Sequence, residues 1–577
     1  MAAYNSTGNC VILAGPGSGK TKTLAIKLAR LLAEDVQPPH GVACITYNTQ
    51  CARELKSKLS GLGVVDGNRV SIGTLHSFCL QHIILPYAHL TPLPKKFPIT
   101  VASIGEVDRL HDQALRMTIG DESWTARFDK YRRDHLNRTA PEWKSDDEDA
   151  ARVIEKYESL LDELGLIDFD GMVLIGLHLV QTYSWIRKAL AARFPVLFVD
   201  EYQDLGHALD RIVQSLCFDA GMRLVAVGDP DQSIYGFTGA EPSLLRNLAA
   251  REDVERVQLR MNYRCGSTII EASEIALDEE RGFESALDEP GAIYFHERPN
   301  GIEDQADFIC GTLIPQALKR RVGRRLGDVA VLYLDKGNGD DIARAVNDAG
   351  WQFIRVDGNN PYQPSPVTYW LEDCAAWCAG AWRTGEIRLS ELVHRWLVFN
   401  ESMRTEKERR IARMTLVSFL YDWRDPNRSL SEWLSQFLIE GLQATLDREP
   451  RLRDDTDKVQ KLLQVSSPKG PLKAFTIGFF GGQGGSPDHL RLSTLHSAKG
   501  LEYDVVIMFG MEDGRMPYYS DSGETLRERR RLFYVGLTRA RHEVHLVYSG
   551  WYANRYGRIF KNGRSRFISE VEAKLRA

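Results

Sequence analysis

The chain has 577 residues, which is too long for one domain and predicts about three or four. Its contents of 43% hydrophobic and 26% charged residues are ordinary for a soluble globular protein, and no apolar run approaches the length of a membrane span. The formal net charge of −5 argues against a protein that coats nucleic acid non-specifically, but it allows a locally basic groove.

The first motif along the chain is a glycine-rich segment. Val11–Leu13 is typical of a short buried strand before it, and Thr23–Leu32 of a helix after it. In that context backbone N–H groups turn towards a phosphate chain, the Lys20 amine reaches the β and γ phosphates, and the Thr21 hydroxyl holds Mg²⁺. The alternative is a glycine-rich turn that matches by chance. The predicted ATP-binding residues of this loop are Gly15, Pro16, Gly17, Ser18, Gly19, Lys20 and Thr21.

Apolar strand-like runs alternate with helical stretches in two blocks, a pattern typical of parallel sheets covered by helices. The runs of the first block are Cys10–Ala14, Val42–Tyr47, Val70–Gly73, Val196–Asp200 and Leu224–Gly228. Those of the second are Ile293–Phe295, Val329–Tyr333, Phe353–Val356, Leu492–Leu495, Val505–Phe509 and Val544–Tyr548. Helical stretches interrupt each block, and the tryptophans of the second stretch are expected to fill a core. The predicted fold is therefore α/β, with two parallel sheets and a mainly helical insertion in each domain.

A pair of carboxylates, Asp200 and Glu201, follows the apolar run Val196–Val199. Alone, such a pair at a strand end is usually part of a solvated loop. After a phosphate-binding loop in the same chain it indicates the second half of an ATPase site. Asp200 can then hold Mg²⁺ through water, and Glu201 can orient and deprotonate the attacking water.

The cysteines and the basic clusters are interpreted as ordinary features. The nine cysteines are scattered without a Cys-x-x-Cys pair, so we expect buried free thiols in a reducing cytoplasm. The chain begins with neither a basic start nor an apolar signal region, which also favours a cytoplasmic protein without a membrane partner. The clusters at 319–325 and 527–531 are expected to be solvated faces.

The motifs, taken in order, resemble those of the UvrD/Rep family of superfamily 1 DNA helicases, and the resemblance covers nearly the whole chain. It implies two RecA-like domains with ATP bound between them. Residues 1–85 and 190–272 would form the first domain, with a helical insertion at 86–189; residues 273–359 and 488–577 would form the second, with an insertion at 360–487. The segments that carry the resemblance are Gly15–Thr21, Ile45–Tyr47, Ala52–Leu55, Gly73–Phe78, Asp168–Asp170, Asp200–Asp204, Val227–Phe237, Asn262–Arg264, Thr494–Glu502 and Arg530–Ala540.

The resemblance also implies roles for single residues at the nucleotide. Gln232 is expected to sense the γ-phosphate and Tyr263 to stack on adenine. Arg264 is expected to touch the γ-phosphate, Glu502 to contact the ribose, and Arg539 to act as an arginine finger. The two arginines would come from opposite sides of a domain cleft and neutralise charge only when it is shut.

Other residues are expected to contact DNA, because hydroxyls and an imidazole at strand ends suit phosphates and aromatic rings suit bases. Phe237 is expected to stack on a base, the alternative being a core aromatic. Tyr556, in a Tyr-Gly turn, is expected to rest against the last base pair of a duplex, the alternative being packing on the neighbouring strand. The expected nucleic-acid contacts are Thr46, Tyr47, His76, Phe237, His496 and Tyr556.

Several positions depart from the family pattern. The family usually has a glutamine-bearing, adenine-reading segment before the loop, and residues 1–14 contain no glutamine, as a truncated or misassigned start would explain. Lys22, expected at the nucleotide, stands where an adenine-stacking arginine is common. Thr238 and Leu334 also replace usual arginines. These changes bear on nucleotide selectivity and unwinding more than on ATP hydrolysis.

The sequence thus predicts an ATP- and Mg²⁺-dependent translocase on single-stranded and tailed duplex DNA, expected to be a 3′→5′ helicase. One alternative keeps the motor without efficient unwinding: a DNA-stimulated ATPase that serves a separate nuclease or repair protein. A second is a nucleotide-dependent switch that is not a motor.

Overall fold

The computed structural model describes residues 2–46, 49–64, 69–90, 99–102, 104–120, 128–136, 138, 140–356, 362, 365–384, 387–449, 452–470, 472–481, 488–554 and 557–576. The chain divides into two compact units, Met1–Arg260 and Met261–Ala577. The predicted first domain extends to residue 272, twelve residues beyond the end of the first unit, and that domain boundary stays a prediction. The short strand β9 (Met261–Asn262) pairs with β10 (Glu284–Ser285), and the Gly266 N–H donates to the Arg541 carbonyl, so this segment belongs to the second unit.

The first unit is built on a parallel sheet. In the described part of the chain its six strands have the order β3-β2-β6-β7-β1-β8. The sheet runs close to the predicted segments, except that β8 was not foreseen, because its two leading residues are charged and exposed. The strands are β1 (Cys10–Ala14), β2 (Val42–Thr46), β3 (Val70–Thr74), β6 (Val196–Val199), β7 (Arg223–Gly228) and β8 (Glu255–Leu259).

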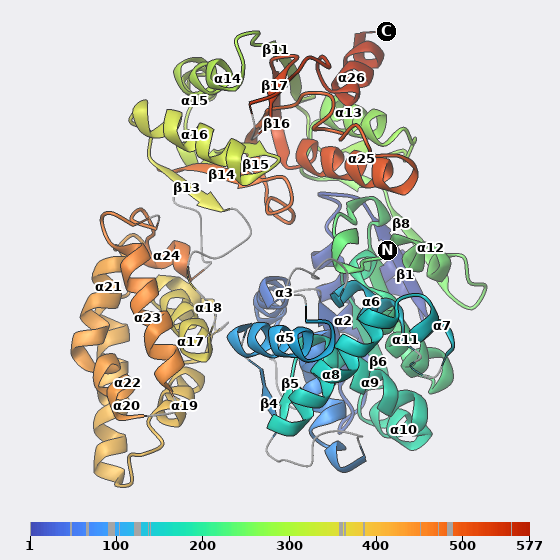
Figure 1. Cartoon of the computed structure of the whole chain (residues 1–577), viewed down its shortest axis with the longest axis vertical. Helices are drawn as coiled ribbons and strands as arrows, with labels where there is room; N and C mark the ends of the chain where they lie inside the picture. The colour runs from blue at the N-terminus through green and yellow to red at the C-terminus, as the bar shows by residue number, and fades with distance from the viewer. Residues whose placement is uncertain are drawn as a thin grey trace. The chain divides into compact units, whose positions relative to one another are not determined.

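Helices cover both faces of this sheet (Figure 1). Alternate residues of β1 enter different cores: Val11 and Leu13 join one apolar cluster, and Ile12 joins the other. The helices are α1 (Ala2–Asn5), α2 (Lys20–Glu34), α3 (Thr49–Gly61), α4 (Leu75–Phe78), α11 (His207–Gln214) and α12 (Pro242–Ala249).

The first insertion is helical, as predicted, apart from two short strands that pair in parallel. Its strands are β4 (Thr100–Val101) and β5 (Leu166–Ile167). Its helices are α5 (Ile104–Thr118), α6 (Phe128–Asp134), α7 (Glu142–Ser145), α8 (Glu148–Leu164), α9 (Phe169–Thr182) and α10 (Ser184–Arg193).

The second unit has its own parallel sheet, in which six described strands have the order β11-β16-β15-β12-β14-β13. These strands are β11 (Ala292–Glu297), β12 (Val329–Tyr333), β13 (Phe353–Val356), β14 (Leu490–Thr494), β15 (Tyr503–Phe509) and β16 (Ala540–Tyr548). A hairpin of β17 (Tyr552–Ala553) and β18 (Ile559–Phe560) follows. The helices of this part are α13 (Ser267–Leu277), α14 (Ile302–Phe308), α15 (Ile314–Arg320), α16 (Lys336–Asp348), α25 (Gly523–Leu537) and α26 (Arg566–Arg576).

The second insertion gathers into one helical bundle (Figure 1). Trp370, Trp396 and Trp433 are buried in its core, as predicted, and Trp370 stacks on Trp396 at 5.1 Å between ring centroids. Cys374 and Cys378 are buried thiols. The bundle consists of α17 (Pro366–Ala376), α18 (Trp382–Thr384), α19 (Leu389–Phe399), α20 (Glu406–Asp422), α21 (Leu430–Phe437), α22 (Gln443–Arg448), α23 (Arg453–Ser466) and α24 (Ile477–Phe480).

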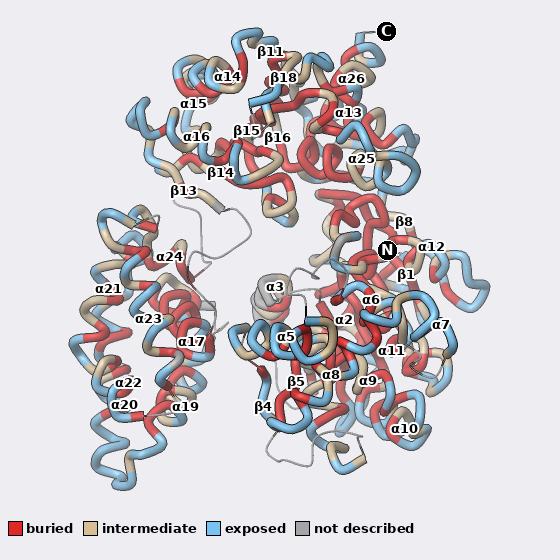
Figure 2. Tube along the Cα trace, in the orientation of Figure 1, coloured by how far each residue is buried: buried red, intermediate tan, exposed pale blue. Residues whose placement is uncertain are grey.

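The strands β1, β2 and β6 of the first unit and β12 of the second are buried along their whole length, and the cores of both units are red in Figure 2. The basic clusters, however, are not simply solvated as predicted. The Arg324 side chain is 1% exposed and ion-pairs with Glu543 at 2.6 Å, and the Arg531 side chain is 5% exposed and ion-pairs with Glu524 at 2.8 Å. None of the described helices combines the length and apolar character that crossing a membrane requires.

Candidate functional site

The glycine-rich loop connects the buried strand β1 to α2, as predicted. Gly17 and Gly19 have φ values of 67° and 82°, in the left-handed region that favours glycine. The Ser18 hydroxyl donates to the Gly15 carbonyl at 2.7 Å, and the Lys20 amine donates to the Ala14 carbonyl at 3.3 Å. The loop therefore carries the backbone conformation and the tethered cation that a phosphate chain requires.

The start of α2 differs slightly from the prediction. The helix begins at Lys20 rather than Thr23, so Thr21 and Lys22 lie in its first turn, where N–H groups have no partner inside the helix. Thr21 is half-buried and Lys22 is exposed, while Pro16 is buried against the strand end. A phosphate at the start of α2 would meet the backbone N–H groups of Thr21 and Lys22 and the positive end of the helix dipole.

The two carboxylates lie where β6 ends, at the same sheet edge as the loop. Parallel pairing places Val199 beside Ile45 and beside Ala226, and it places Leu13 beside Gly228. The Asp200 N–H donates to the Ile45 carbonyl at 2.8 Å, and its carboxylate accepts from the Glu201 N–H at 3.0 Å. The carboxyl ends of β1, β2, β6 and β7 thus gather the predicted ATP residues on one edge.

Glu201 has a strained backbone. Its φ of 53° places a residue with a Cβ in the left-handed region, at a cost of roughly 1–3 kcal/mol. Its carboxylate accepts a short hydrogen bond from the Gln203 amide. Strain that the surrounding structure holds in place is concentrated at functional sites, which agrees with the role predicted for this carboxylate.

A chain of hydrogen bonds joins Glu201 to Gln232. The Gln203 side-chain oxygen accepts from the Asp229 N–H at 3.0 Å, and the Asp229 carboxylate accepts from the Gln232 amide at 2.7 Å. Asp229 is fully buried and Gln232 is 4% exposed. The Gln232 amide and the Glu201 carboxylate are thus linked through the side chains of Asp229 and Gln203. Sequence reasoning missed Gln203 and Asp229, because neither role follows from local pattern.

The candidate Mg²⁺ ligands fit that ion chemically. Thr21 offers a hydroxyl and Asp200 a carboxylate, which are the hard oxygen donors that Mg²⁺ prefers, with its other positions left to water and phosphate. Asp200 is 3% exposed, so its charge is desolvated. A divalent cation is one means of compensating such a buried charge.

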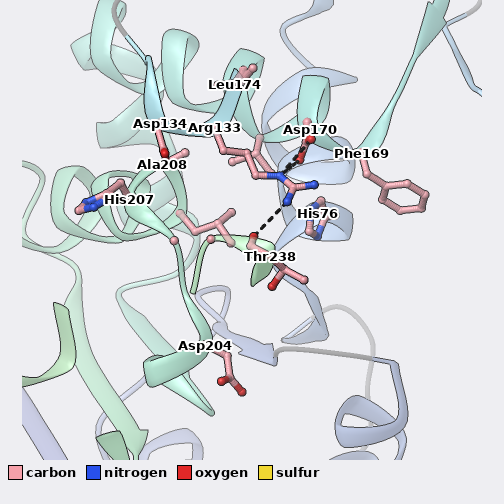
Figure 3. Close-up of a pocket in the computed structure, with 14 residues that line it drawn as sticks. His76, Arg133, Asp134, Phe169, Asp170, Leu174, Asp204, His207, Ala208 and Thr238 are labelled. Carbon is pink, nitrogen blue, oxygen red and sulfur yellow. Dashed lines mark hydrogen bonds and ion pairs between the residues drawn. The ribbon is translucent and has the colours of Figure 1, made fainter. Parts of the chain in front are cut away.

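One cavity of about 250 Å³ in the first unit includes His76, which is predicted to contact DNA (Figure 3). His76, Phe169 and Thr238 line it. Arg133 links two segments that line the cavity: its guanidinium ion-pairs with Asp170 at 3.0 Å and donates to the Thr238 carbonyl at 3.1 Å. Phe169 is 59% exposed, and its ring lies 5.6 Å from the His76 ring. Segments that are far apart in the sequence thus meet in one polar and aromatic cavity.

The two units carry the same local structure at the end of one strand. Thr-Leu-His-Ser occurs at 74–77 after β3 and at 494–497 at the end of β14. In each case the threonine hydroxyl accepts from the serine N–H at 3.2 Å. Burial lowers the pKa of His76, and burial with Arg529 lowers the pKa of His496 to about 4, so both rings are neutral at pH 7. The identical tetrapeptides were a signal in the sequence that went unused.

Arg264 and Glu502 are held together in the second unit. Arg264 Nε ion-pairs with the Glu502 carboxylate at 2.8 Å, and Arg541 binds the other oxygen. Burial raises the pKa of Glu502, but Arg264 and Arg541 outweigh it and hold that pKa below its usual range. Tyr263 beside them is 66% exposed, as a ring that stacks on a base requires. These residues form a compact charged group.

Arg539 is 1% exposed and donates to the Val535 and Leu501 carbonyls at 3.0 and 3.2 Å. Both it and Arg264 lie in the second unit, which differs from the prediction that they come from opposite sides of a cleft. The arginine-finger role of Arg539 stays a prediction, and to reach a phosphate its guanidinium must give up these hydrogen bonds.

Some predicted DNA contacts have no described side chain. Tyr47 and Tyr556 lie outside the described residues, and Phe237 is placed by its backbone alone, in the 3-10 turn Gly236–Thr238. Thr46 is described, but it is 2% exposed at the end of β2. The residues around Tyr556 form the β17–β18 hairpin, in which Gly557 has a φ of 76°. The predicted tight turn is present, whereas the contacts of Tyr556 stay a prediction.

Comparison with known proteins agrees with this geometry. Residues 1–253 match the model of the UvrD/REP helicase N-terminal domain, and residues 482–550 match that of the UvrD-like helicase C-terminal domain. The chain is 26% identical to the ATP-dependent DNA helicase PcrA of Leuconostoc citreum, over 100% of this chain and 84% of the relative. It is 25% identical to DNA helicase II of Escherichia coli, over 99% of this chain and 87% of the relative. It is 26% identical to the ATP-dependent DNA helicase Rep of the same species, over 98% of this chain and 92% of the relative. Because the motifs, the two parallel sheets and both domain models agree, the chain belongs to the UvrD/Rep-like helicase family of ATP-hydrolysing enzymes.

Proposed function

We propose that the protein is an ATP-driven motor that moves 3′→5′ on single-stranded DNA and separates the strands of a tailed duplex. Lys20 would hold the phosphates, and Thr21 and Asp200 would hold Mg²⁺, which neutralises charge on the phosphates. Glu201 would take the proton of the attacking water, and Arg264 with Arg539 would stabilise the transition state.

The buried hydrogen-bond chain from Glu201 to Gln232 is the observation that supports a motor most directly. Gln232 lies in the segment that continues into the turn of Phe237, and the Thr238 carbonyl next to it is bound by Arg133 in the cavity of His76. Glu201, the predicted base, is thus connected to the segment of Phe237 and to the cavity of His76 through hydrogen bonds and adjacent residues of the chain. A change of nucleotide state could therefore alter the grip on a strand.

One experiment tests the proposal: the ATPase rate with and without single-stranded DNA, paired with displacement on duplexes that carry a 3′ or a 5′ tail. We expect stimulation by single strands and displacement only from the 3′ tail. Stimulation without displacement would favour a motor that serves a separate nuclease or repair protein. A rate that single strands leave unchanged would favour a nucleotide switch, and displacement from the 5′ tail would reverse the proposed direction.

Phe237 provides a test of the strand contact. Base stacking contributes roughly 1–3 kcal/mol per base. We therefore expect Phe237→Ala to weaken coupling to DNA and to slow translocation, while ATP hydrolysis without DNA persists. Stopped-flow translocation and ATPase titrations with oligonucleotides measure both effects. A thermal melt is the control, because a variant that unfolds would show that Phe237 is a core residue.

Tyr556 provides a test of strand separation. Tyr556 falls between β17 and β18 in the sequence, and a ring there could replace the stacking partner that a base pair loses on opening, an exchange of about a few kcal/mol. Tyr556→Ala should lower displacement of a tailed duplex and leave single-strand-stimulated ATPase and translocation nearly intact. Equal loss of all three activities would indicate a packing role, and unchanged displacement would remove Tyr556 from the separation step.

A further inference from the structure

A loop of the second unit, residues 512–521, carries exposed aromatic side chains that none of the predicted sites uses. Tyr519 is 81% exposed and Tyr518 is 39% exposed. The loop follows β15 and leads into α25, at the carboxyl edge of the second parallel sheet. An exposed tyrosine in a loop is common, so the surroundings of these rings decide whether they have a role.

Arginine side chains alternate with aromatic rings from this loop to the β17–β18 hairpin. Arg529 lies over the Tyr518 ring at 4.6 Å. Arg515 lies 5.6 Å from the Tyr552 ring, Tyr552 stacks on Phe560 at 5.1 Å, and Arg558 lies 5.2 Å from Phe560. We call this set the arginine–aromatic surface; its members are Arg515, Tyr518, Tyr519, Arg529, Tyr552, Arg558 and Phe560.

Hydrogen bonds hold parts of this surface in place. The Asp521 carboxylate accepts from the Tyr518 N–H at 2.9 Å and from Arg529 Nε at 3.1 Å. The Tyr552 hydroxyl donates to the Gly514 carbonyl at 3.3 Å, which ties the loop to the hairpin. These contacts hold the loop beside Tyr519 in place, and a loop that is already ordered loses little conformational freedom on binding, so more of the contact energy contributes to affinity.

The surface also connects two predicted DNA contacts within one unit. At one end, the charge of Arg529 helps to lower the pKa of His496, which lies just after the end of β14. At the other end is the β17–β18 hairpin; Tyr556 falls between its two strands in the sequence, outside the described residues. Tyr519 lies near Tyr552. The pKa of Tyr552 is raised mainly by burial, and Tyr519 adds to that increase.

We infer that the arginine–aromatic surface binds single-stranded nucleic acid, with Tyr519 stacking on a base between the hairpin and His496. The inference rests on the proposed function. Guanidinium groups meet phosphates, and rings stack on bases of any sequence, which suits a strand that must slide. A protein partner would also use exposed tyrosines, but the arginines that lie against Tyr518, Tyr552 and Phe560 favour a polyanion with flat bases.

Affinity for a short oligothymidylate, measured by fluorescence anisotropy on the full chain without nucleotide, tests the inference. We expect Tyr519→Ala to weaken binding by roughly five- to 100-fold, since stacking on one base is lost. Tyr519→Phe keeps the ring and should bind within about twofold of the unaltered protein. The matched control is Tyr421→Ala, which removes another exposed tyrosine, 45% exposed on α20 of the second insertion.

A second readout follows the ring itself. Tyr519→Trp should bind the oligonucleotide and show tryptophan quenching that saturates with it. Equal affinity of Tyr519→Ala and the unaltered protein, or no difference in quenching between Tyr519→Trp and the parent, would overturn the inference and leave the surface for a protein partner. An unaltered protein that fails to bind the oligonucleotide would overturn the proposed function and this inference together.

Discussion

Glu201→Gln should bind ATP and fail to turn it over, whereas Lys20→Ala should lose both binding and hydrolysis. Glutamine keeps the shape of Glu201 and can keep a hydrogen bond to Gln203, but it cannot take a proton from water. The expected loss of turnover is roughly 10²–10⁴-fold, the usual contribution of a general base. Lys20 instead supplies a charge to the phosphates, so its removal weakens the ground state as well.

Binding of a fluorescent ATP analogue and steady-state phosphate release, both with saturating single-stranded DNA, separate the two effects. Glu252→Gln is the matched control, because Glu252 is an exposed glutamate of the same unit outside the predicted site. Near-normal turnover by Glu201→Gln would show that another group is the base. Normal ATP affinity in Lys20→Ala would show that the loop holds phosphate without its amine.

Much of the geometry of the candidate nucleotide site could be predicted from the sequence, because the segments that form it are local. A strand, a glycine turn and a helix start are adjacent in the chain, so the pattern at Gly15–Thr21 contains the geometry of the loop. The same holds for Asp200 and Glu201, which follow directly on β6. The parallel order of the strands then brings these separate local patterns to one edge.

The parts that could not be predicted depend on contacts between distant segments. The Asp229–Gln203 hydrogen bond and the Arg133–Thr238 contact each join segments that are far apart in the chain, and neither leaves a periodic signal. Arg324 looks like one charge in a basic cluster, yet Glu543 of β16 makes its burial favourable. The β9–β10 pairing joins residues 261–262 to the second unit, and it is too short to recognise from two residues of each strand.

The second large effect is expected at Arg264 and Arg539. If both act in the transition state, Arg264→Ala and Arg539→Ala should each cut turnover by roughly 10³-fold or more, with a much smaller loss of ATP binding. The two side chains share a neighbour: Arg264 donates to the Thr538 carbonyl at 3.4 Å, and Arg539 donates to the Thr538 hydroxyl at 3.3 Å. Their effects should therefore fall short of additive in the double variant.

Arg539 is the harder of the two to interpret, because its replacement by alanine removes a buried guanidinium that donates to the carbonyls of Val535 and Leu501. Arg539→Lys is the informative variant: it keeps the buried charge but loses the planar fork, so turnover should still fall while the melting temperature changes little. Arg527→Ala, an exposed arginine on α25, is the control for loss of charge alone. If Arg539→Lys hydrolyses ATP normally, Arg539 braces Leu501 beside Glu502 and does not touch the phosphates. If Arg264→Ala hydrolyses ATP normally, Arg264 serves only to pair with Glu502 and does not act in the transition state.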